Sequence, residues 1–249
     1  MPFLVAGDPA VDSLPGALKG CERGGASVIE VGIPFSDPIA DGPVIAAAMH
    51  RALQRGVTPA MVFEQIAGVR AEIRAAIVVM VSVSIVTRLG GGVRFVRQAA
   101  EAGVDGFIFP DAPLEESEQL LGAARDAGVA VSLLVSPTTR PERLVQIAQA
   151  CTGFVYVLAR AGLTGERSDA PSVGGVVGAV RRATQTPVVC GFGVSTADHV
   201  REVSRYADGV IVGSAIVRRL AELGSTGEPV EMACERLVRE FASGLGGGV

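Results

Sequence analysis

Two carboxylates near the start of the chain have the types and spacing for acid–base chemistry. Glu30 lies at the end of a short apolar, β-branched run, and a loop rich in Gly, Pro and Asp leads from it to Asp41. An unpaired carboxylate costs several kcal/mol to bury, so a glutamate inside a buried strand needs a partner or a use. Apolar surroundings raise the pKa of such a carboxyl and let it exchange protons near neutral pH. Asp41 would then bind an N–H donor or a developing positive charge.

Each carboxylate also has a purely structural interpretation. Glu30 would hold backbone amides, and Asp41 would form a turn with its own backbone before Gly42. Because both residues lie on one strand–loop segment, we favour chemistry over structure and expect it at the carboxyl end of the strand.

Two glycine-bearing segments in the last quarter of the chain are typical of anion binding. Gly191-Phe192-Gly193 follows one β-branched run and Gly213-Ser214 follows the next. Glycines let backbone N–H groups approach an anion, and Ser214 opens a predicted helix whose amino terminus adds its dipole and a hydroxyl. The same residues also suit ordinary turns, with Ser214 as a helix cap. Their position after two successive strands favours a phosphate site built without Lys or Arg.

The other candidate side chains carry weaker signals. Tyr156, one of two tyrosines, suits a site-facing role and a core role equally. Cys190 is expected to be a small core residue, because no histidine base lies near it in sequence. We expect turn and capping roles for Asp8, Asp37 and Asp111, and exposed positions on helices for His50 and His199.

The elements that position these residues alternate regularly along the chain. Short apolar, β-branched runs predict strands at residues 3–6, 27–31, 77–81, 106–109, 130–134, 153–158, 187–190 and 209–212. Amphipathic stretches between them predict helices that include residues 11–23, 93–102, 114–127 and 141–150. Strands that are apolar throughout and separated by helices indicate a parallel sheet covered on both faces.

Eight strand–helix units in about 250 residues predict an α/β fold, a (β/α)₈ TIM barrel, as a single domain over residues 1–249. A doubly wound open sheet is the alternative, but no Gly-rich dinucleotide-binding fingerprint follows the first strand. In a barrel the catalytic groups lie at the carboxyl ends of the strands, where Glu30, Tyr156 and the two glycine segments fall. Residues 244–249 form a Gly-rich tail that we expect to be frayed.

The composition argues against several classes of protein. Hydrophobic residues make up 49% and charged residues 19%, and the net charge is −4, which indicates a large core and no nucleic-acid partner. No apolar run has membrane-spanning length, and the start lacks a signal-peptide pattern. Four widely spaced cysteines suit a reduced, cytoplasmic compartment. With two histidines in the chain, a His-based metal site is not expected.

Six segments that contain these candidates resemble one enzyme family. They are PFLVAGDP at 2–9, IEVGIPFSDPIADGPVI at 29–45, AGVDGFIFPDAP at 102–113, GFVYVLARAGLTGERS at 153–168, PVVCGFGVST at 187–196 and YADGVIVGSAIV at 206–217. On these segments the chain resembles the tryptophan synthase alpha subunit over nearly its whole length. The second and fourth segments are specific to that family, whereas related phosphate-binding barrels share the Gly-Phe-Gly and Gly-Ser segments.

The resemblance implies a lyase that cleaves indole-3-glycerol phosphate to indole and glyceraldehyde 3-phosphate in tryptophan biosynthesis. The catalytic glutamate falls on Glu30, which would protonate C3 of the indole and handle the glycerol hydroxyl proton. The catalytic aspartate falls on Asp41, which would bind the indole N–H, and the active-site tyrosine falls on Tyr156. The family's pocket-wall, loop and phosphate positions fall on Phe3, Thr164, Gly165, Gly193, Gly213 and Ser214.

The resemblance implies no cofactor and no metal in this subunit. It implies one protein partner, the pyridoxal-phosphate-dependent beta subunit, in an alpha2beta2 heterotetramer in which indole reaches the beta subunit through a tunnel. Asp37, Pro38 and Ile39 would face that partner.

Two features depart from the family pattern. The family has a helix before the first strand that covers the bottom of the barrel. That helix is expected to be missing here, which would expose apolar surface. After the third strand the family has a Tyr-Tyr-Asn or Tyr-x-Asn run, where this chain has Val83-Ser84-Ile85. This second change concerns the contact with the beta subunit more than the chemistry, because the chain retains both Glu30 and Asp41.

Three other functions remain open on the sequence. The Val83-Ser84-Ile85 stretch suggests a stand-alone lyase that releases free indole. A weakly catalytic barrel that mainly binds and activates a beta subunit is a second alternative, against which the intact Glu30 and Asp41 argue. A different phosphate-binding barrel, such as a phosphoribosyl isomerase, is the third.

Overall fold

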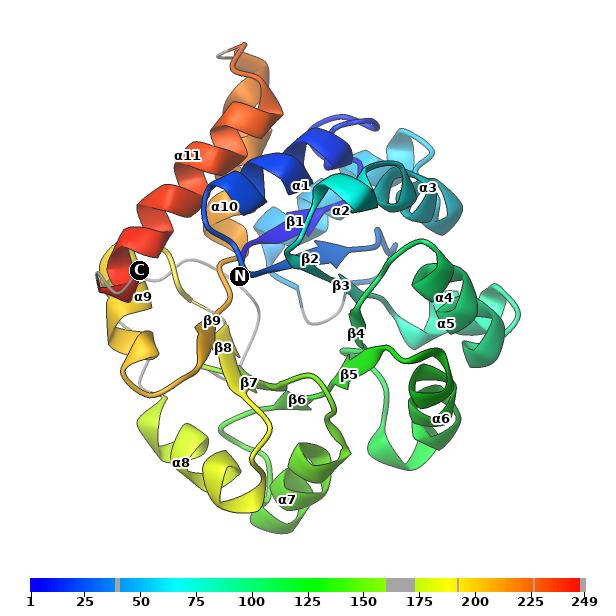
Figure 1. The fold of residues 1–249 in the computed structure, drawn as a ribbon, viewed down its shortest axis with the longest axis vertical. Helices are drawn as coiled ribbons and strands as arrows, with labels where there is room; N and C mark the ends of the chain where they lie inside the picture. The colour runs from blue at the N-terminus through cyan, green and yellow to red at the C-terminus, as the bar shows by residue number, and fades with distance from the viewer. Residues whose placement is uncertain (39–40, 160–172, 192, 226, 247–249) are drawn as a thin grey trace.

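In the computed structural model, this chain folds into a ring of strands enclosed by helices (Figure 1). The structure describes residues 1–38, 41–159, 173–191, 193–225 and 227–246. Every strand pairing in this part of the chain is parallel. The predicted (β/α)₈ barrel is therefore confirmed.

Each of the eight predicted strands is present, and the fifth is split in two. The strands are β1 (Phe3–Val5), β2 (Val28–Gly32), β3 (Ala76–Met80), β4 (Gly106–Ile108), β5 (Ala130–Ser132), β6 (Leu134–Val135), β7 (Val155–Leu158), β8 (Val188–Gly191) and β9 (Gly209–Val210). They form one sheet in the order β1 to β5 and a second in the order β6 to β9. Leu133 separates β5 from β6, and its backbone N–H donates to the Cys151 sulfur at 3.2 Å instead of to a neighbouring strand.

The ring closes between its first and last strands. Pro2 and Val212 form a parallel bridge, and the Phe3 N–H donates to the Val212 carbonyl at 3.0 Å. Closure leaves no strand edge at this point, and it brings Phe3 next to the residues that follow β9.

The described helices are α1 (Leu14–Arg23), α2 (Pro43–Gln54), α3 (Pro59–Val69), α4 (Val83–Arg88), α5 (Gly92–Glu101), α6 (Glu118–Ala127), α7 (Pro141–Ala150), α8 (Gly174–Ala183), α9 (Ala197–Ser204), α10 (Ser214–Ala221) and α11 (Val230–Ala242), with short 3₁₀ turns at Arg70–Glu72, Leu114–Glu116, Glu222–Ser225 and Ser243–Leu245. The prediction for residues 141–150 matches α7. The predicted helix 114–127 breaks at Ser117, whose hydroxyl donates to the Pro113 carbonyl at 2.7 Å.

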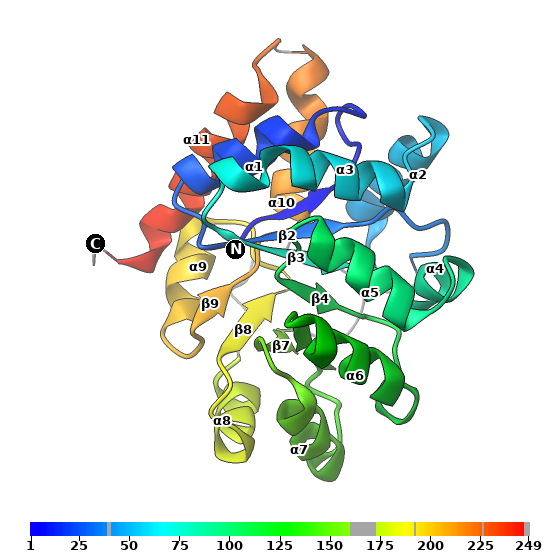
Figure 2. The same ribbon diagram turned by 45° about the vertical axis from the view of Figure 1, so that its right-hand side comes forward.

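The helices cover the strands with buried apolar faces. Figure 2 shows α5, α6, α7 and α8 outside the strands, and α1 beside α11, so that the two ends of the chain pack together. Cys190 lies in β8 with no exposed surface, as its core assignment predicted. No described helix is long and apolar enough to cross a membrane.

The prediction of a frayed tail from residue 244 was wrong at its first residue. Gly244 is buried in the Ser243–Leu245 turn, which packs on α9. A side chain there would lie 2.1 Å from the Ala197 carbonyl, so the two backbones touch. This contact between segments far apart in sequence orders the glycine, and residues 247–249 lie outside the described residues.

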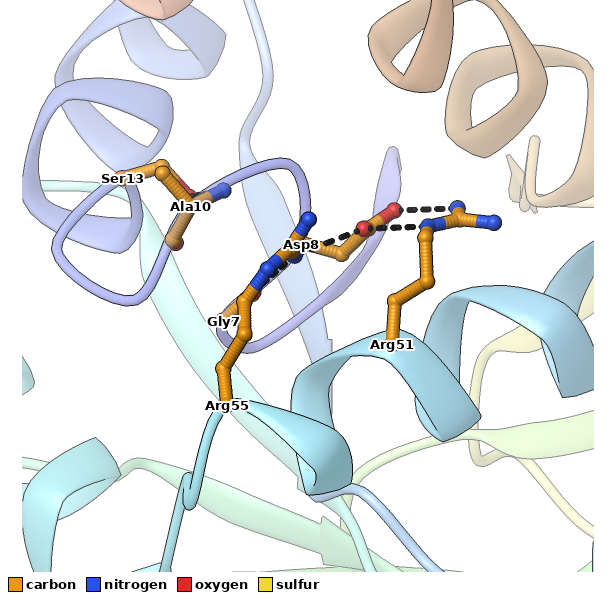
Figure 3. Close-up of polar contacts among 6 residues, drawn as sticks. All are labelled: Gly7, Asp8, Ala10, Ser13, Arg51 and Arg55. Carbon is orange, nitrogen blue, oxygen red and sulfur yellow. Dashed lines mark hydrogen bonds and ion pairs between the residues drawn. The ribbon is translucent and has the colours of Figure 1, made fainter.

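An ion-pair cluster joins the turn after β1 to α2. The Asp8 carboxylate accepts hydrogen bonds from Arg51 at 2.8 and 2.7 Å and from Arg55 at 3.2 Å, and Arg55 also donates to the Gly7 carbonyl (Figure 3). The Asp8 side chain is only 3% exposed. Asp8 is therefore a turn residue, as predicted, with the added role of holding a helix that begins just after Asp41.

Asp8→Asn should destabilise the fold, because the amide cannot accept both guanidinium pairs and two cations would then lie together. Both arginines are about one-third exposed and partly hydrated, so we expect a loss of about 2 kcal/mol in the free energy of unfolding. Urea unfolding measures it. The exposed Asp12→Asn in the same turn is the matched control, and equal effects of the two variants would contradict a structural role for the cluster.

Candidate active site

A cavity of about 310 Å³ opens at the carboxyl ends of the strands. Its walls are mainly apolar, with a small number of polar groups, which is typical of a site for a small organic molecule. The lining residues are Phe3, Glu30, Ile33, Phe35, Asp37, Pro38, Asp41, Ile45, Met49, Met80, Val81, Ser82, Pro110, Asp111, Leu134, Tyr156, Gly193, Val194, Ile211, Gly213 and Ser214.

The carboxyl of Glu30 lies inside the barrel on β2. The residue is 1% exposed, and its Oε2 atom has no hydrogen-bond partner among the described residues. Burial raises the pKa of Glu30 to about 8, and the charge of Asp41 adds to the rise. Glu30 is therefore mainly protonated at neutral pH. A buried, protonated carboxyl that lines a cavity is suited to donate a proton to a bound molecule.

Asp41 reaches the same cavity from the loop between β2 and α2. Its backbone N–H donates to the Pro38 carbonyl at 3.0 Å. Burial raises the pKa of Asp41 to about 6, so its carboxyl is mainly ionised at neutral pH. Two carboxyls in one cavity with pKa values on opposite sides of neutrality can act as an acid and a hydrogen-bond acceptor at the same time.

Tyr156 and Phe3 complete this side of the cavity. Burial and the charges of Glu30 and Asp41 raise the pKa of the Tyr156 hydroxyl well above its usual range, so it stays neutral and donates hydrogen bonds. Phe3 lies on β1, where its main chain pairs with that of Glu30 on β2. The structure thus brings together four residues predicted from separate strands and a loop.

Two glycines make room for these rings, and sequence reasoning gave neither of them that role. A Cβ atom on Gly32 would lie 2.8 Å from the Phe3 ring, and one on Gly191 would lie 2.6 Å from the Tyr156 hydroxyl oxygen. Contacts this short are not tolerated without movement of the ring. The signal available in the sequence was a glycine at the end of an apolar strand.

Gly191→Ala should therefore displace Tyr156 into the cavity. We expect about a tenfold loss of kcat/KM and a loss of about 1–2 kcal/mol in the free energy of unfolding, from overpacking. Steady-state kinetics and urea unfolding measure the two effects. Gly122→Ala on α6, where nothing lies within 4 Å of the added carbon, is the control. A fully active Gly191→Ala variant would show that the ring is not held at this position.

Three of the predicted anion-binding residues, Gly193, Gly213 and Ser214, also line the cavity. Gly193 follows β8 with φ of 80°, a left-handed conformation that favours glycine. Gly213 caps α10, and Ser214 is the first residue of that helix, with 8% of its surface exposed. The wall therefore includes a glycine turn and the amino terminus of a helix, two features that suit the binding of an anion.

The remaining predicted positions divide into three groups. Asp37 and Pro38 line the mouth of the cavity. Ile39, Thr164 and Gly165 lie outside the described residues. Asp111 has the expected capping role, since it accepts hydrogen bonds from the Val83 N–H at 3.0 Å and from the Ser82 hydroxyl at 2.6 Å at the start of α4.

Sequence reasoning missed the apolar part of the wall and one histidine. Ile45 and Met49 come from α2, the helix on which His50 was predicted to lie but whose bounds were not predicted, and Met80 comes from the end of β3. His50 is exposed as predicted, but the prediction for His199 was wrong: it is 7% exposed, because its ring packs beneath the turn that follows β8. Within the described residues no three His, Cys, Asp or Glu side chains gather as metal ligands.

Comparison with known proteins agrees with this geometry. The family model for the tryptophan synthase alpha chain matches residues 1–245. The chain belongs to this family. The tryptophan synthase alpha chain of a Synechococcus strain is 43% identical over 241 residues, which cover 95% of this chain and 89% of that protein. The corresponding protein of a Picosynechococcus strain is 42% identical over 247 residues, which cover 98% and 91%.

Solved structures extend the likeness to three dimensions. A structure of Mycobacterium tuberculosis tryptophan synthase superposes with a TM-score of 0.88 at 34% identity, covering 99% of this chain and 92% of that one. A tryptophan synthase complex from Pyrococcus furiosus superposes with a TM-score of 0.85 at 31% identity, covering 97% and 96%. The tryptophan synthase alpha family thus has this barrel in structures from both organisms.

Proposed function

We propose that this chain cleaves indole-3-glycerol phosphate to indole and glyceraldehyde 3-phosphate by a retro-aldol reaction in tryptophan biosynthesis. The observation that supports it most strongly is the pairing of a protonated Glu30 with an ionised Asp41 in one apolar cavity. An indole ring needs apolar walls, an acceptor for its N–H and a proton donor at C3. The apolar lining, Asp41 and Glu30 support these three roles. Membership of the tryptophan synthase alpha family supports the same reaction.

The proposed mechanism uses one carboxyl twice. Asp41 accepts the hydrogen bond of the indole N–H and stabilises the positive charge that grows on the ring. Glu30 transfers its proton to C3, and its carboxylate then takes the proton of the glycerol hydroxyl next to C3. The bond between C3 and that carbon breaks, its electron pair restores the indole ring, and the carbon becomes the aldehyde. Glu30 ends protonated, so the proton balance closes within the site.

The other predicted residues have binding roles in this proposal. Phe3 packs against the indole, and the neutral Tyr156 hydroxyl orients the reacting groups. The phosphate binds at the rim formed by Gly193, Gly213 and Ser214, together with Gly165. Thr164, which directly precedes Gly165 in the sequence, would order the Asp41 side chain, as the resemblance to the family implies. No step calls for a cofactor or a metal ion within this chain.

The proposed partner is a tryptophan synthase beta subunit, which carries the pyridoxal phosphate, in an alpha2beta2 assembly. Asp37, Pro38 and Ile39 would contact it, because the first two lie at the mouth of the cavity. We place the reaction in the cytoplasm, where four buried free cysteines are stable as thiols.

Indole release tests the proposed function directly. The purified chain is incubated with indole-3-glycerol phosphate, with and without a beta subunit, and both products are quantified. We expect slow cleavage by the isolated chain and strong acceleration by the beta subunit.

Two results of this assay would change the proposal. Inactivity under both conditions would overturn it, and a parallel assay with a phosphoribosyl substrate would then test the isomerase alternative. Full activity without any response to a beta subunit would favour the stand-alone lyase, for which the altered Val83-Ser84-Ile85 stretch at the start of α4 is the specific observation.

A further inference from the structure

His199 links a rigid helix to the turn that lines the anion-binding rim. Its Nδ1 atom lies 3.3 Å from the Gly193 carbonyl oxygen and 3.4 Å from both the backbone nitrogen and the hydroxyl of Ser195. With a proton on Nδ1 the ring donates to the Gly193 carbonyl, and without one it accepts from Ser195. Either form ties the same three-residue turn to α9.

The helix that carries this ring is itself held in place. The Thr196 side chain caps α9 by accepting the His199 N–H at 3.2 Å. Val200 and Val203 are buried, and Gly244 packs against Ala197 and Val200 of the helix. The imidazole therefore projects from a helix that is held in place. Its contacts restrain the turn and do not shift the helix.

With the proton on Nδ1, the hydrogen bond to the Gly193 carbonyl fixes the orientation of the next peptide unit. The Gly193 carbonyl and the Val194 N–H belong to one planar trans peptide and point in opposite directions. When the carbonyl faces His199, the Val194 N–H faces away from the ring. Gly193 and Val194 both line the cavity, and His199 does not. An N–H that is held in one orientation binds an anion without a further entropy cost.

We propose that His199 is a positioning residue that holds the Gly193–Val194 peptide in the orientation that binds the phosphate of the substrate. This inference rests on the proposed function, which places the phosphate at that rim. His199 acts through the backbone and does not touch the substrate. It should therefore affect binding of the phosphate end and leave the indole end and the chemical step unchanged.

Three substitutions separate positioning from simple packing. His199→Ala removes the ring. His199→Asn places an amide atom at the same distance along the side chain as Nδ1, and so it can remake the contact. His199→Gln is closer to the ring in length, but its amide lies one bond further out. Glu202→Ala, on the same helix, loses only an ion pair with Arg205 and is the control.

The experiment measures the affinity of each variant for glycerol 3-phosphate and for indole, together with KM and kcat for cleavage. For His199→Ala we expect glycerol 3-phosphate to bind about tenfold more weakly and KM to rise in parallel, the usual effect of losing one hydrogen bond. Indole affinity and kcat should stay within about twofold of wild type. His199→Asn should recover most of the loss, and His199→Gln should not.

Several results would contradict a positioning role for His199. Unchanged glycerol 3-phosphate affinity in His199→Ala, or equal weakening of both ligands, would overturn the inference. So would an Asn variant no better than the Gln variant. If the wild-type chain itself fails to bind glycerol 3-phosphate, the phosphate site of the proposed function fails first, and this inference fails with it.

Discussion

Glu30→Gln should lower kcat for cleavage of indole-3-glycerol phosphate by about 10³-fold, a typical loss when a general acid–base group is removed. The amide keeps the size and polarity of the side chain, but it can neither protonate C3 nor take the glycerol hydroxyl proton. KM should change by less than about threefold, because the binding groups are other residues. Indole release in steady state measures both constants.

The matched control is Glu64→Gln, an exposed glutamate on α3, which should behave as wild type. The pH profile adds a second check. Activity should rise as Asp41 ionises around pH 6 and fall as Glu30 loses its proton around pH 8, with apparent values that belong to the coupled pair. A Glu30→Gln variant that retains more than about a tenth of wild-type kcat would show that another group supplies the proton.

The same substitution should stabilise the fold at pH values above 4.5. Burial raises the pKa of Glu30 from 4.5 to about 8 on folding. The contribution of Glu30 to the free energy of unfolding is therefore fully present below pH 4.5. It is lost progressively as the pH rises to about 8, because the unfolded chain ionises Glu30 and the folded chain does not. At ~1.4 kcal/mol per pH unit, the loss reaches about 5 kcal/mol. Glutamine does not titrate, so Glu30→Gln should become increasingly more stable than wild type over this range.

Urea unfolding of both proteins at a series of pH values measures this difference. Glu64→Gln is again the control, and its difference from wild type should not change with pH over this range. If the curves of wild type and Glu30→Gln ran parallel from pH 4.5 to pH 8, Glu30 would have a normal pKa in the folded state. The acid role proposed for it would then have no physical basis.

Together these two predictions say that the residue proposed to donate the proton also lowers the stability of the fold. The Glu30 carboxyl, whose Oε2 atom has no hydrogen-bond partner in the described part of the chain, lowers the stability of the fold at working pH, and the same burial makes it a proton donor. Asp8, by contrast, is a buried carboxylate with two arginine partners and only a structural role. The presence or absence of a partner distinguishes the two acids.

Much of the fold follows from local patterns along the chain. The strand positions are set by β-branched runs that have to be buried on both faces, and helix α7 begins at Pro141 as its sequence predicted. Glu30 was identifiable because an acid in such a run is costly, whatever the rest of the chain does. Gly32 and Gly191 were visible as glycines at strand ends, but their role depends on rings from β1 and β7.

Other features depend on contacts between distant segments. Helix α2 supplies Ile45 and Met49 to the cavity, and its anchor is Asp8, some forty residues earlier. His199 has the pattern of an exposed helix residue, yet the turn after β8 covers its ring. Gly244 belongs to a Gly-rich tail but is buried against α9. Local periodicity carries no information on these contacts, because the partners come from elsewhere in the chain.

By itself, then, the sequence determined where the strands form, in what order, and that Glu30 lies in the second of them. Those properties depend on side chains a few residues apart. Only the tertiary structure decided that Glu30 is protonated and Asp41 ionised in the same cavity, and that Gly193 is held by His199. Burial, pKa and peptide orientation depend on every element packed around a group, and these elements come together only when the barrel closes.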